Sequence, residues 1–300
     1  MPKIFQALFA STLLFLSIAA ADAQQDDDLQ SNPAAAAFQA AIEAASIGPA
    51  PIPLINQAVL HLPVNNLFIP KAEAAEFMEQ IGNYTDDSLL GIIMPADDEH
   101  DWMVIATYEK SGYIKEDDAK DWNANELLSA LKEATESQNE QRRAQGIPEF
   151  VVSRWVQPPT YDTATHRLVW SAELRDKHPE PGSETGVNYN TYALGREGYI
   201  SLNLVTNIDA IEADKPAALA LLNNLQFNAG KRYEEFDAST DRLATYGLAA
   251  LVGGIAAKKL GLFAVIAAFA AKFIKIIALA AVAGLAGLKK FFSSRKQQDQ

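Results

Sequence analysis

The stretches RLVWSAE (residues 167–173), NYNTYAL (188–194) and YISLNLV (199–205) are the strongest indication of the fold class. Each is rich in β-branched or aromatic residues and is bounded by Pro, Gly or Asp, which is typical of β-strands. The stretch FVVSRWV at 150–156 has the same character, and Pro158-Pro159 and Arg196-Glu197-Gly198 are expected to form turns. Strands that follow one another this closely along the chain predict an antiparallel sheet.

Further strands are expected outward from this region, with only a few helices between them. The predicted strands cover residues 57–62, 66–69, 89–94 and 102–108, and the predicted helices cover 34–45, 71–81, 123–145 and 208–225. Runs of strands with few helices favour an α+β fold, a largely antiparallel sheet covered by helices. The order of the elements resembles the PsbP/Mog1-like α/β/α sandwich. We place this domain at 54–242, after a flexible lead-in at 24–53 that ends in a Gly- and Pro-rich break.

The two ends of the chain indicate export and a membrane. Residues 1–23 combine Lys3, an apolar stretch and the small residues Ala21 and Ala23, which predicts a secretory signal peptide. A retained N-terminal anchor helix is the alternative. The chain contains no cysteine, which is compatible with the periplasm. We therefore expect a bacterial envelope protein.

Charge is divided unevenly along the chain, whose net charge is −13. Residues 24–242 hold 16 basic and 36 acidic residues, whereas residues 243–300 hold eight basic residues and one acidic residue. An acidic body is repelled by phosphate backbones, so nucleic acid is not an expected partner. A basic, apolar tail is instead attracted to anionic lipid headgroups.

Residues 243–292 are predicted to be a membrane-embedded helical region, followed by a basic polar tail at 293–300. The apolar runs in this tract are interrupted or flanked by the basic residues Lys258, Lys259, Lys272, Lys275, Lys289, Lys290, Arg295 and Lys296. No uncharged run reaches the ~20 residues that a span needs. A transmembrane helix with its lysines facing a partner helix or water, and helices lying in the interface, both remain open. Small residues in the tract would allow a hairpin or a homo-oligomer.

The candidate chemical groups are few. Asp97, Asp98, His100 and Asp101 form the densest polar cluster, and Asp117-Asp118 is a second acidic pair. Carboxylates and an imidazole can bind a divalent cation, but consecutive residues cannot all point to one centre, so a solvated loop is favoured. The sequence contains no HExxH, GxSxG, P-loop or GxGxxG motif. We predict no cofactor, metal site or catalytic residue.

Several short stretches resemble a known family. These stretches are 90–95 (LGIIMP), 112–114 (GYI) with 117–119 (DDA), 155–162 (WVQPPTYD), 168–171 (LVWS), 188–189 (NY), 194–198 (LGREG) and 246–247 (YG). Together they resemble the bacterial predicted membrane-anchored protein family, domain of unknown function 2167, from about residue 54 to 292. Ile114 stands where valine is expected and Ser171 where alanine is expected. The resemblance implies an exported body with a C-terminal membrane anchor and brings no assigned activity.

The function favoured by the sequence is that of a non-enzymatic envelope protein. Its body would lie in the periplasm at the inner membrane and bind another envelope component, and its tail would contact the lipid bilayer. One alternative is an envelope hydrolase that uses carboxylates between residues 97 and 118. The other is a lipid-interacting protein that acts through its lysine-spaced interfacial helices.

Overall fold

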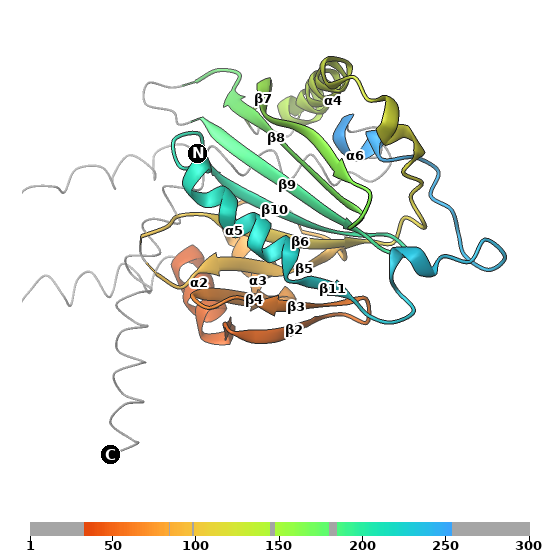
Figure 1. Cartoon of the computed structure of the whole chain (residues 1–300). Helices are drawn as coiled ribbons and strands as arrows, with labels where there is room; N and C mark the ends of the chain where they lie inside the picture. Colours follow the sequence, from red (N-terminus) through yellow and green to blue (C-terminus); the bar gives the residue numbers. More distant parts are fainter. Residues whose placement is uncertain (1–32, 84, 98, 145–147, 180–184, 254–300) are drawn as a thin grey trace, which may run out of the picture.

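The computed structural model describes residues 33–83, 85–97, 99–144, 148–179 and 185–253 (Figure 1). An eight-stranded sheet in the order β1-β4-β5-β6-β10-β9-β8-β7 forms its centre. The strands are β1 (Ser46–Ile47), β4 (Asn66–Pro70), β5 (Leu89–Pro95), β6 (Met103–Glu109), β7 (Phe150–Asp162), β8 (Arg167–Asp176), β9 (Gly186–Leu194) and β10 (Tyr199–Asn207). All neighbouring pairs are antiparallel, as the closely spaced strands of the sequence predict.

One face of this sheet is covered by helix α5 (Ile211–Asn223) and a small second sheet. The small sheet has the order β11-β3-β2 and is built from β2 (Ala50–Leu54), β3 (Ala58–Leu62) and β11 (Leu225–Phe227). A hydrophobic core lies between the large sheet and this layer. Residues on alternate positions of β10, such as Ile200, Leu202 and Leu204, point into this core. This two-residue period is the one that strand geometry imposes.

Within the described residues, four helices cover the opposite face in two separate groups. Helices α2 (Pro33–Ala44) and α3 (Lys71–Gln80) pack over β4, β5 and β6, where Phe77 and Ile92 are fully buried. Helices α4 (Ala124–Ala144) and α6 (Ala249–Gly253) pack over β7, β8 and β9. The fold is therefore α+β, a large antiparallel sheet between two covering layers, and that prediction is confirmed.

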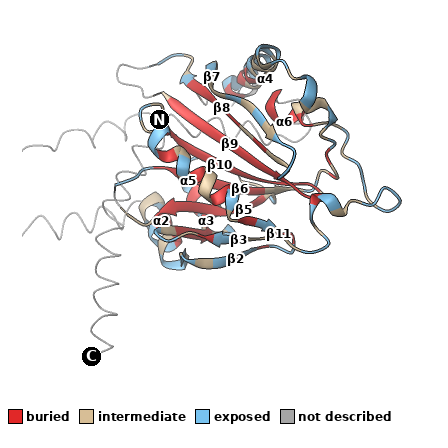
Figure 2. Cartoon of the chain, viewed as in Figure 1, coloured by how far each residue is buried: buried red, intermediate tan, exposed pale blue. Residues whose placement is uncertain are grey.

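Strands β9 and β10 lie at the centre of the sheet and are covered on both faces. Nearly every residue in them is buried, and both strands are coloured red along almost their whole length in Figure 2. An antiparallel strand with one solvated face would alternate between buried and exposed residues. The polar residues of β9 and β10 therefore lie inside the molecule.

Two sequence predictions differ from the structure. The lead-in predicted to be flexible at 24–53 is ordered from residue 33 onward. Helix α2 is anchored by buried Phe38 and Ala41, and β2 pairs with β3. Pro51 and Pro53 occupy an edge strand, where a missing backbone N–H is tolerated. Pro158-Pro159 also lies within β7, another edge strand, beside shifts in its pairing register, so the turn predicted there is wrong.

The predicted membrane tract is described only as far as Gly253. Within the described part of the chain, no helix is both long and apolar enough to cross a bilayer. The predicted signal peptide at 1–23 and the basic residues from Lys258 to Lys296 lie outside the described residues.

Candidate functional site

The polar cluster predicted between Asp97 and Asp101 is a local turn in the loop between β5 and β6. The Asp97 carboxylate accepts hydrogen bonds from the His100 ring at Nδ1 (2.8 Å) and from the Glu99 backbone N–H (3.1 Å). The hydrogen bond to Asp97 raises the pKa of His100. Asp98 lies outside the described residues, and Asp101 is exposed. Among the residues that the structure describes, no group of three or more His, Asp or Glu side chains could hold a metal ion.

Asp118, in the second acidic pair, caps the N-terminus of α6, the last described helix, with its side chain. Its carboxylate accepts the backbone N–H groups of Leu248 (3.1 Å) and Ala249 (2.9 Å), at the N-terminus of α6. These groups have no partner within the helix, so a carboxylate stabilises them. A Cβ on Gly247 would lie 2.5 Å from Asp118 Oδ2, so this approach requires glycine. Asp118 thus attaches the start of the C-terminal tract to the body.

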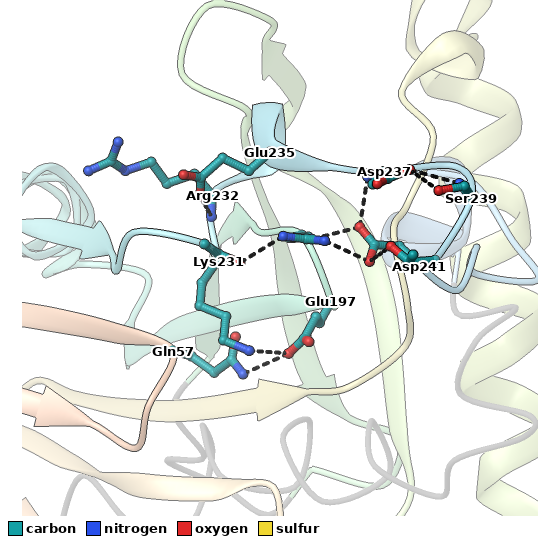
Figure 3. Close-up of polar contacts among 11 residues, drawn as sticks. Gln57, Glu197, Lys231, Arg232, Glu235, Asp237, Ser239 and Asp241 are labelled. Carbon is teal, nitrogen blue, oxygen red and sulfur yellow. Dashed lines mark hydrogen bonds and ion pairs between the residues drawn. The ribbon is translucent and has the colours of Figure 1, made fainter.

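The loop that precedes this helix is held on the turn between β9 and β10. Arg196 donates two hydrogen bonds to Asp241, from Nε (2.6 Å) and Nη2 (2.9 Å), and Lys231 pairs with Glu197 at 2.8 Å. Gln57 donates a further hydrogen bond to Glu197 at 3.0 Å (Figure 3). The bidentate contact with Arg196 holds the pKa of Asp241 at about 2. The charged residues of the 194–198 stretch are therefore engaged in fixing a loop.

A third attachment lies between these two. Tyr113 donates its backbone N–H to Arg242 and accepts the N–H of Ala244, both at 2.8 Å. The preceding Gly112 has a φ of +90°, and a Cβ there would lie 2.6 Å from the Arg242 carbonyl oxygen. Three successive contacts, at 231–241, 242–244 and 247–249, thus hold the chain that leads into the tract.

Glu116, Tyr161 and His166 form a cluster that the sequence did not predict. Glu116 Oε2 lies 3.1 Å from His166 Nδ1 and accepts a hydrogen bond from the Tyr161 hydroxyl. The Glu116 and His166 side chains are 28% and 22% exposed, so solvent reaches both. His166 has a φ of 53°, an uncommon conformation for a residue other than glycine. The three residues are 5 to 50 positions apart in sequence, and only the β7–β8 hairpin and the loop after β6 bring them together.

Aromatic rings support this cluster from one side. Tyr113 stacks between Tyr233 and Phe236, with centroids 4.3 Å and 4.0 Å away, and His166 stacks on Tyr233 at 4.1 Å. The Tyr233 hydroxyl donates to the Ile114 carbonyl oxygen at 2.7 Å. The imidazole is therefore held by ring contacts and by a carboxylate. A carboxylate that accepts a hydrogen bond from Nδ1 leaves Nε2 able to accept a proton, the arrangement of a general base.

Comparison with known families gives one match over most of the chain. The model of the family described as "Protein of unknown function (DUF2167)" matches residues 46–283. The chain belongs to this family. The resemblance inferred from the sequence is thus confirmed, and the family description assigns no activity. No curated protein matches the chain.

Two solved structures are similar to this protein at a low level. The solution structure of cyanobacterial PsbP (CyanoP) from Synechocystis sp. PCC 6803 has 9% identity and a TM-score of 0.35, covering 57% of this chain and 86% of that one. The crystal structure of the Saccharomyces cerevisiae Ran-binding protein Mog1p has 11% identity and a TM-score of 0.31, covering 64% of this chain and all of that one. Scores this low support no conclusion about function.

Proposed function

We propose that this DUF2167 protein is an exported envelope protein that is anchored by its C-terminal tract and acts by binding another envelope component. The observation that carries the proposal is the threefold attachment of residues 231–249 to the body. A flexible linker would need no such contacts, because it would only tether the domain. An attached segment instead gives the body a defined orientation relative to whatever holds the tract. Such an orientation suits a protein that presents a binding surface at a membrane.

Exposed apolar side chains support binding as the activity of the body. Ile47, Ile55 and Val64 are 40%, 55% and 65% exposed. Ile47 belongs to edge strand β1. The next residue, Gly48, lies so close to Pro63 that an added Cβ would meet the Pro63 carbonyl oxygen. Ile47 and Val64, which adjoin these two residues, therefore lie on neighbouring segments. Ile55 has a φ of 49°, which is strained for a β-branched residue. Exposed apolar groups beside open sheet edges are features of partner surfaces.

The anchoring part of the proposal is tested by labelling single cysteines in an otherwise cysteine-free chain. We expect Ser129→Cys, on the exposed side of α4, to react in intact cells with a membrane-impermeant maleimide that reaches the periplasm. We expect Ser294→Cys to react only after the cells are lysed. Labelling of both positions in intact cells would contradict a single span and favour the interfacial alternative. Absence of labelling at Ser129→Cys before lysis, with labelling afterwards, would contradict export of the body.

One observation favours a second function, acid–base hydrolysis. In the Glu116–His166 pair, His166 contacts the carboxylate through Nδ1, so its other ring nitrogen, Nε2, faces away from that contact. Glu116 falls within the region 97–118 from which a hydrolase was expected to take its carboxylates. If this alternative holds, the purified full chain should hydrolyse p-nitrophenyl acetate faster than buffer. His166→Asn and Glu116→Gln should then each lower that rate by about 100-fold, the contribution typical of a general base. A rate that equals buffer, or that both variants retain, would rule out this use of the pair.

A further inference from the structure

Glu116, Tyr161 and His166 bring three donor atoms close to one point. His166 Nδ1 lies 3.1 Å from Glu116 Oε2 and 3.4 Å from the Tyr161 hydroxyl oxygen, and this hydroxyl also donates to Oε2. The separation of 3.4 Å exceeds the ~3.2 Å at which ordinary hydrogen bonds end, so Tyr161 and His166 are neighbours without a good bond to each other. A carboxylate oxygen, a phenol oxygen and an imidazole nitrogen therefore form a triangle.

The sides of this triangle have the lengths found between ligands of one metal ion. A first-row transition-metal ion holds nitrogen and oxygen donors at about 2.1 Å, so two donors at right angles or at a tetrahedral angle lie roughly 3.0–3.4 Å from each other. Both distances from His166 Nδ1 fall in this range. The third side is the hydrogen bond from Tyr161 to Glu116, which lengthens when an ion replaces the phenol proton. The three atoms can thus contact one ion after small side-chain rotations.

The β7–β8 hairpin fixes the two ligands that it carries. Tyr161 and His166 stand at the two ends of its turn, and the Asp162 carboxylate accepts two hydrogen bonds from within that turn, at 2.9 Å and 2.7 Å. The imidazole is further held by its stacking on Tyr233, at 4.1 Å between centroids. Ligands that are positioned beforehand lose little further conformational entropy when they bind an ion.

The surroundings of the triangle suit a cation. Burial and the charges of Glu116 and Asp117 raise the pKa of Tyr113, so two carboxylates act on this side of the body. The excess of acidic over basic residues in 24–242 adds a field that attracts cations. Glu116 and His166 are partly exposed, which gives an ion a path of entry and leaves room for water as a further ligand.

The donor set indicates which ion fits. An imidazole suits iron, zinc, copper and nickel, whereas sites of carboxylate and carbonyl oxygens suit magnesium and calcium. The third donor is a tyrosine, which sets this group apart from sites made of His, Asp and Glu alone. A tyrosine oxygen is a known ligand of iron, as in the haem of catalase. Two oxygen donors, one of them a phenol, and one nitrogen donor therefore favour ferric iron.

We propose that Glu116, Tyr161 and His166 bind one ferric ion, with water completing its coordination. On binding, the O–H bond of Tyr161 breaks, its oxygen bonds to the iron and the proton passes to water, so no electron is transferred. His166 binds through the lone pair of Nδ1, and its ring proton then lies on Nε2. The hydrolase alternative needs the opposite tautomer, with a free lone pair on Nε2. The site is also independent of how the C-terminal tract is anchored.

Visible absorption of the purified full chain in detergent tests this assignment, because an iron–tyrosinate bond gives a charge-transfer band in the visible region. The protein is treated with EDTA, dialysed and titrated with ferric nitrilotriacetate. We expect a band that saturates at one iron per chain and is absent from Tyr161→Phe. His166→Asn and Glu116→Gln should each weaken iron binding at least about tenfold, the loss that even an outer-shell change can cause. Asparagine tolerates the φ of 53° at position 166, so the first of these variants keeps the turn.

The Asp97–His100 pair supplies the matched control, since it joins a carboxylate to an imidazole at 2.8 Å and involves no tyrosine. His100→Asn should leave both the band and the iron affinity unchanged. Tyr113→Phe should do the same, because it keeps the ring stack and removes only a hydroxyl outside the triangle.

Electron paramagnetic resonance gives a second readout, a high-spin ferric signal that the wild-type chain shows and His166→Asn loses, and it decides the matter if Tyr161→Phe does not fold. No band in the wild-type chain, a band that folded Tyr161→Phe retains, or an equal loss in His100→Asn would overturn the proposal. A chain that binds no iron but hydrolyses p-nitrophenyl acetate in EDTA would overturn it in favour of the hydrolase.

Discussion

Asn139→Ala is expected to lower the free energy of unfolding by about 4 kcal/mol, since it strips the partners from two buried backbone groups that each cost roughly 1–3 kcal/mol when unsatisfied. Asn139 lies on α4 and is fully buried. Its amide nitrogen donates to the Phe150 carbonyl oxygen at 2.7 Å, and its amide oxygen accepts the Phe150 N–H at 3.0 Å. One side chain therefore replaces a missing neighbour strand at the start of edge strand β7.

The measurement is urea unfolding of the full chain in detergent, followed by tryptophan fluorescence. Ser137→Ala, two residues away on the exposed side of α4, is the matched control and should change stability by less than about 0.5 kcal/mol. Asn139→Ala should also loosen α4 from β7, seen as faster hydrogen exchange at Phe150. A loss smaller than 1 kcal/mol for Asn139→Ala would mean that water replaces the amide at no cost, and the assigned role would be wrong.

Gly198→Ala is the second substitution with a large expected effect, a loss of about 3 kcal/mol, at the upper end of the cost of overpacking. A Cβ at this position would lie 1.8 Å from the backbone carbonyl oxygen of Glu109, and a backbone atom in a paired strand cannot move aside easily. The turn between β9 and β10 would have to shift away from β6. Arg196 and Glu197 in the same turn would move with it and weaken their contacts with Asp241 and Lys231.

Thermal unfolding and limited trypsin digestion at Lys231 together measure this effect. Gly230→Ala is the matched control, because Gly230 has a φ of +81° but nothing within 4 Å of an added Cβ. Its expected cost is only about 1 kcal/mol, from backbone strain alone. Gly198→Ala should expose Lys231 to trypsin, whereas a stability equal to that of Gly230→Ala would show that the turn accommodates the methyl group.

The antiparallel core could be predicted because its signals are local. The β-branched and aromatic runs in β8, β9 and β10, and the apolar stripe of Leu127, Leu128 and Leu131 in α4, repeat with the periods of strand and helix. Strand β2 could not be predicted in this way, because Pro51 and Pro53 normally signal a break. Its pairing with β3 depends on its position at a sheet edge, which is a property of the tertiary structure.

The candidate sites also differ in whether their residues are close together in the sequence. The cluster at Asp97–His100 was visible because its members are adjacent, and the structure finds only a local turn there. The contact of His166 with Glu116 joins residues 50 positions apart, and that of Asp118 with Ala249 joins residues 131 apart. No spacing rule covers such separations. His166 and Asp118 could be noticed in the sequence, but not their partners.

The family, the α+β class and the contrast between an acidic body and a basic, apolar tail could all be predicted from the sequence, because short motifs, local periodicity and composition carry that information. The attachment of the start of the tail to the body through Arg196, Tyr113 and Asp118 is visible only in the folded chain. The same holds for the buried amide of Asn203, which has no hydrogen-bond partner among the residues that the structure describes. Hydrogen bonding and burial depend on which distant segments the fold brings together, and no local pattern contains that information.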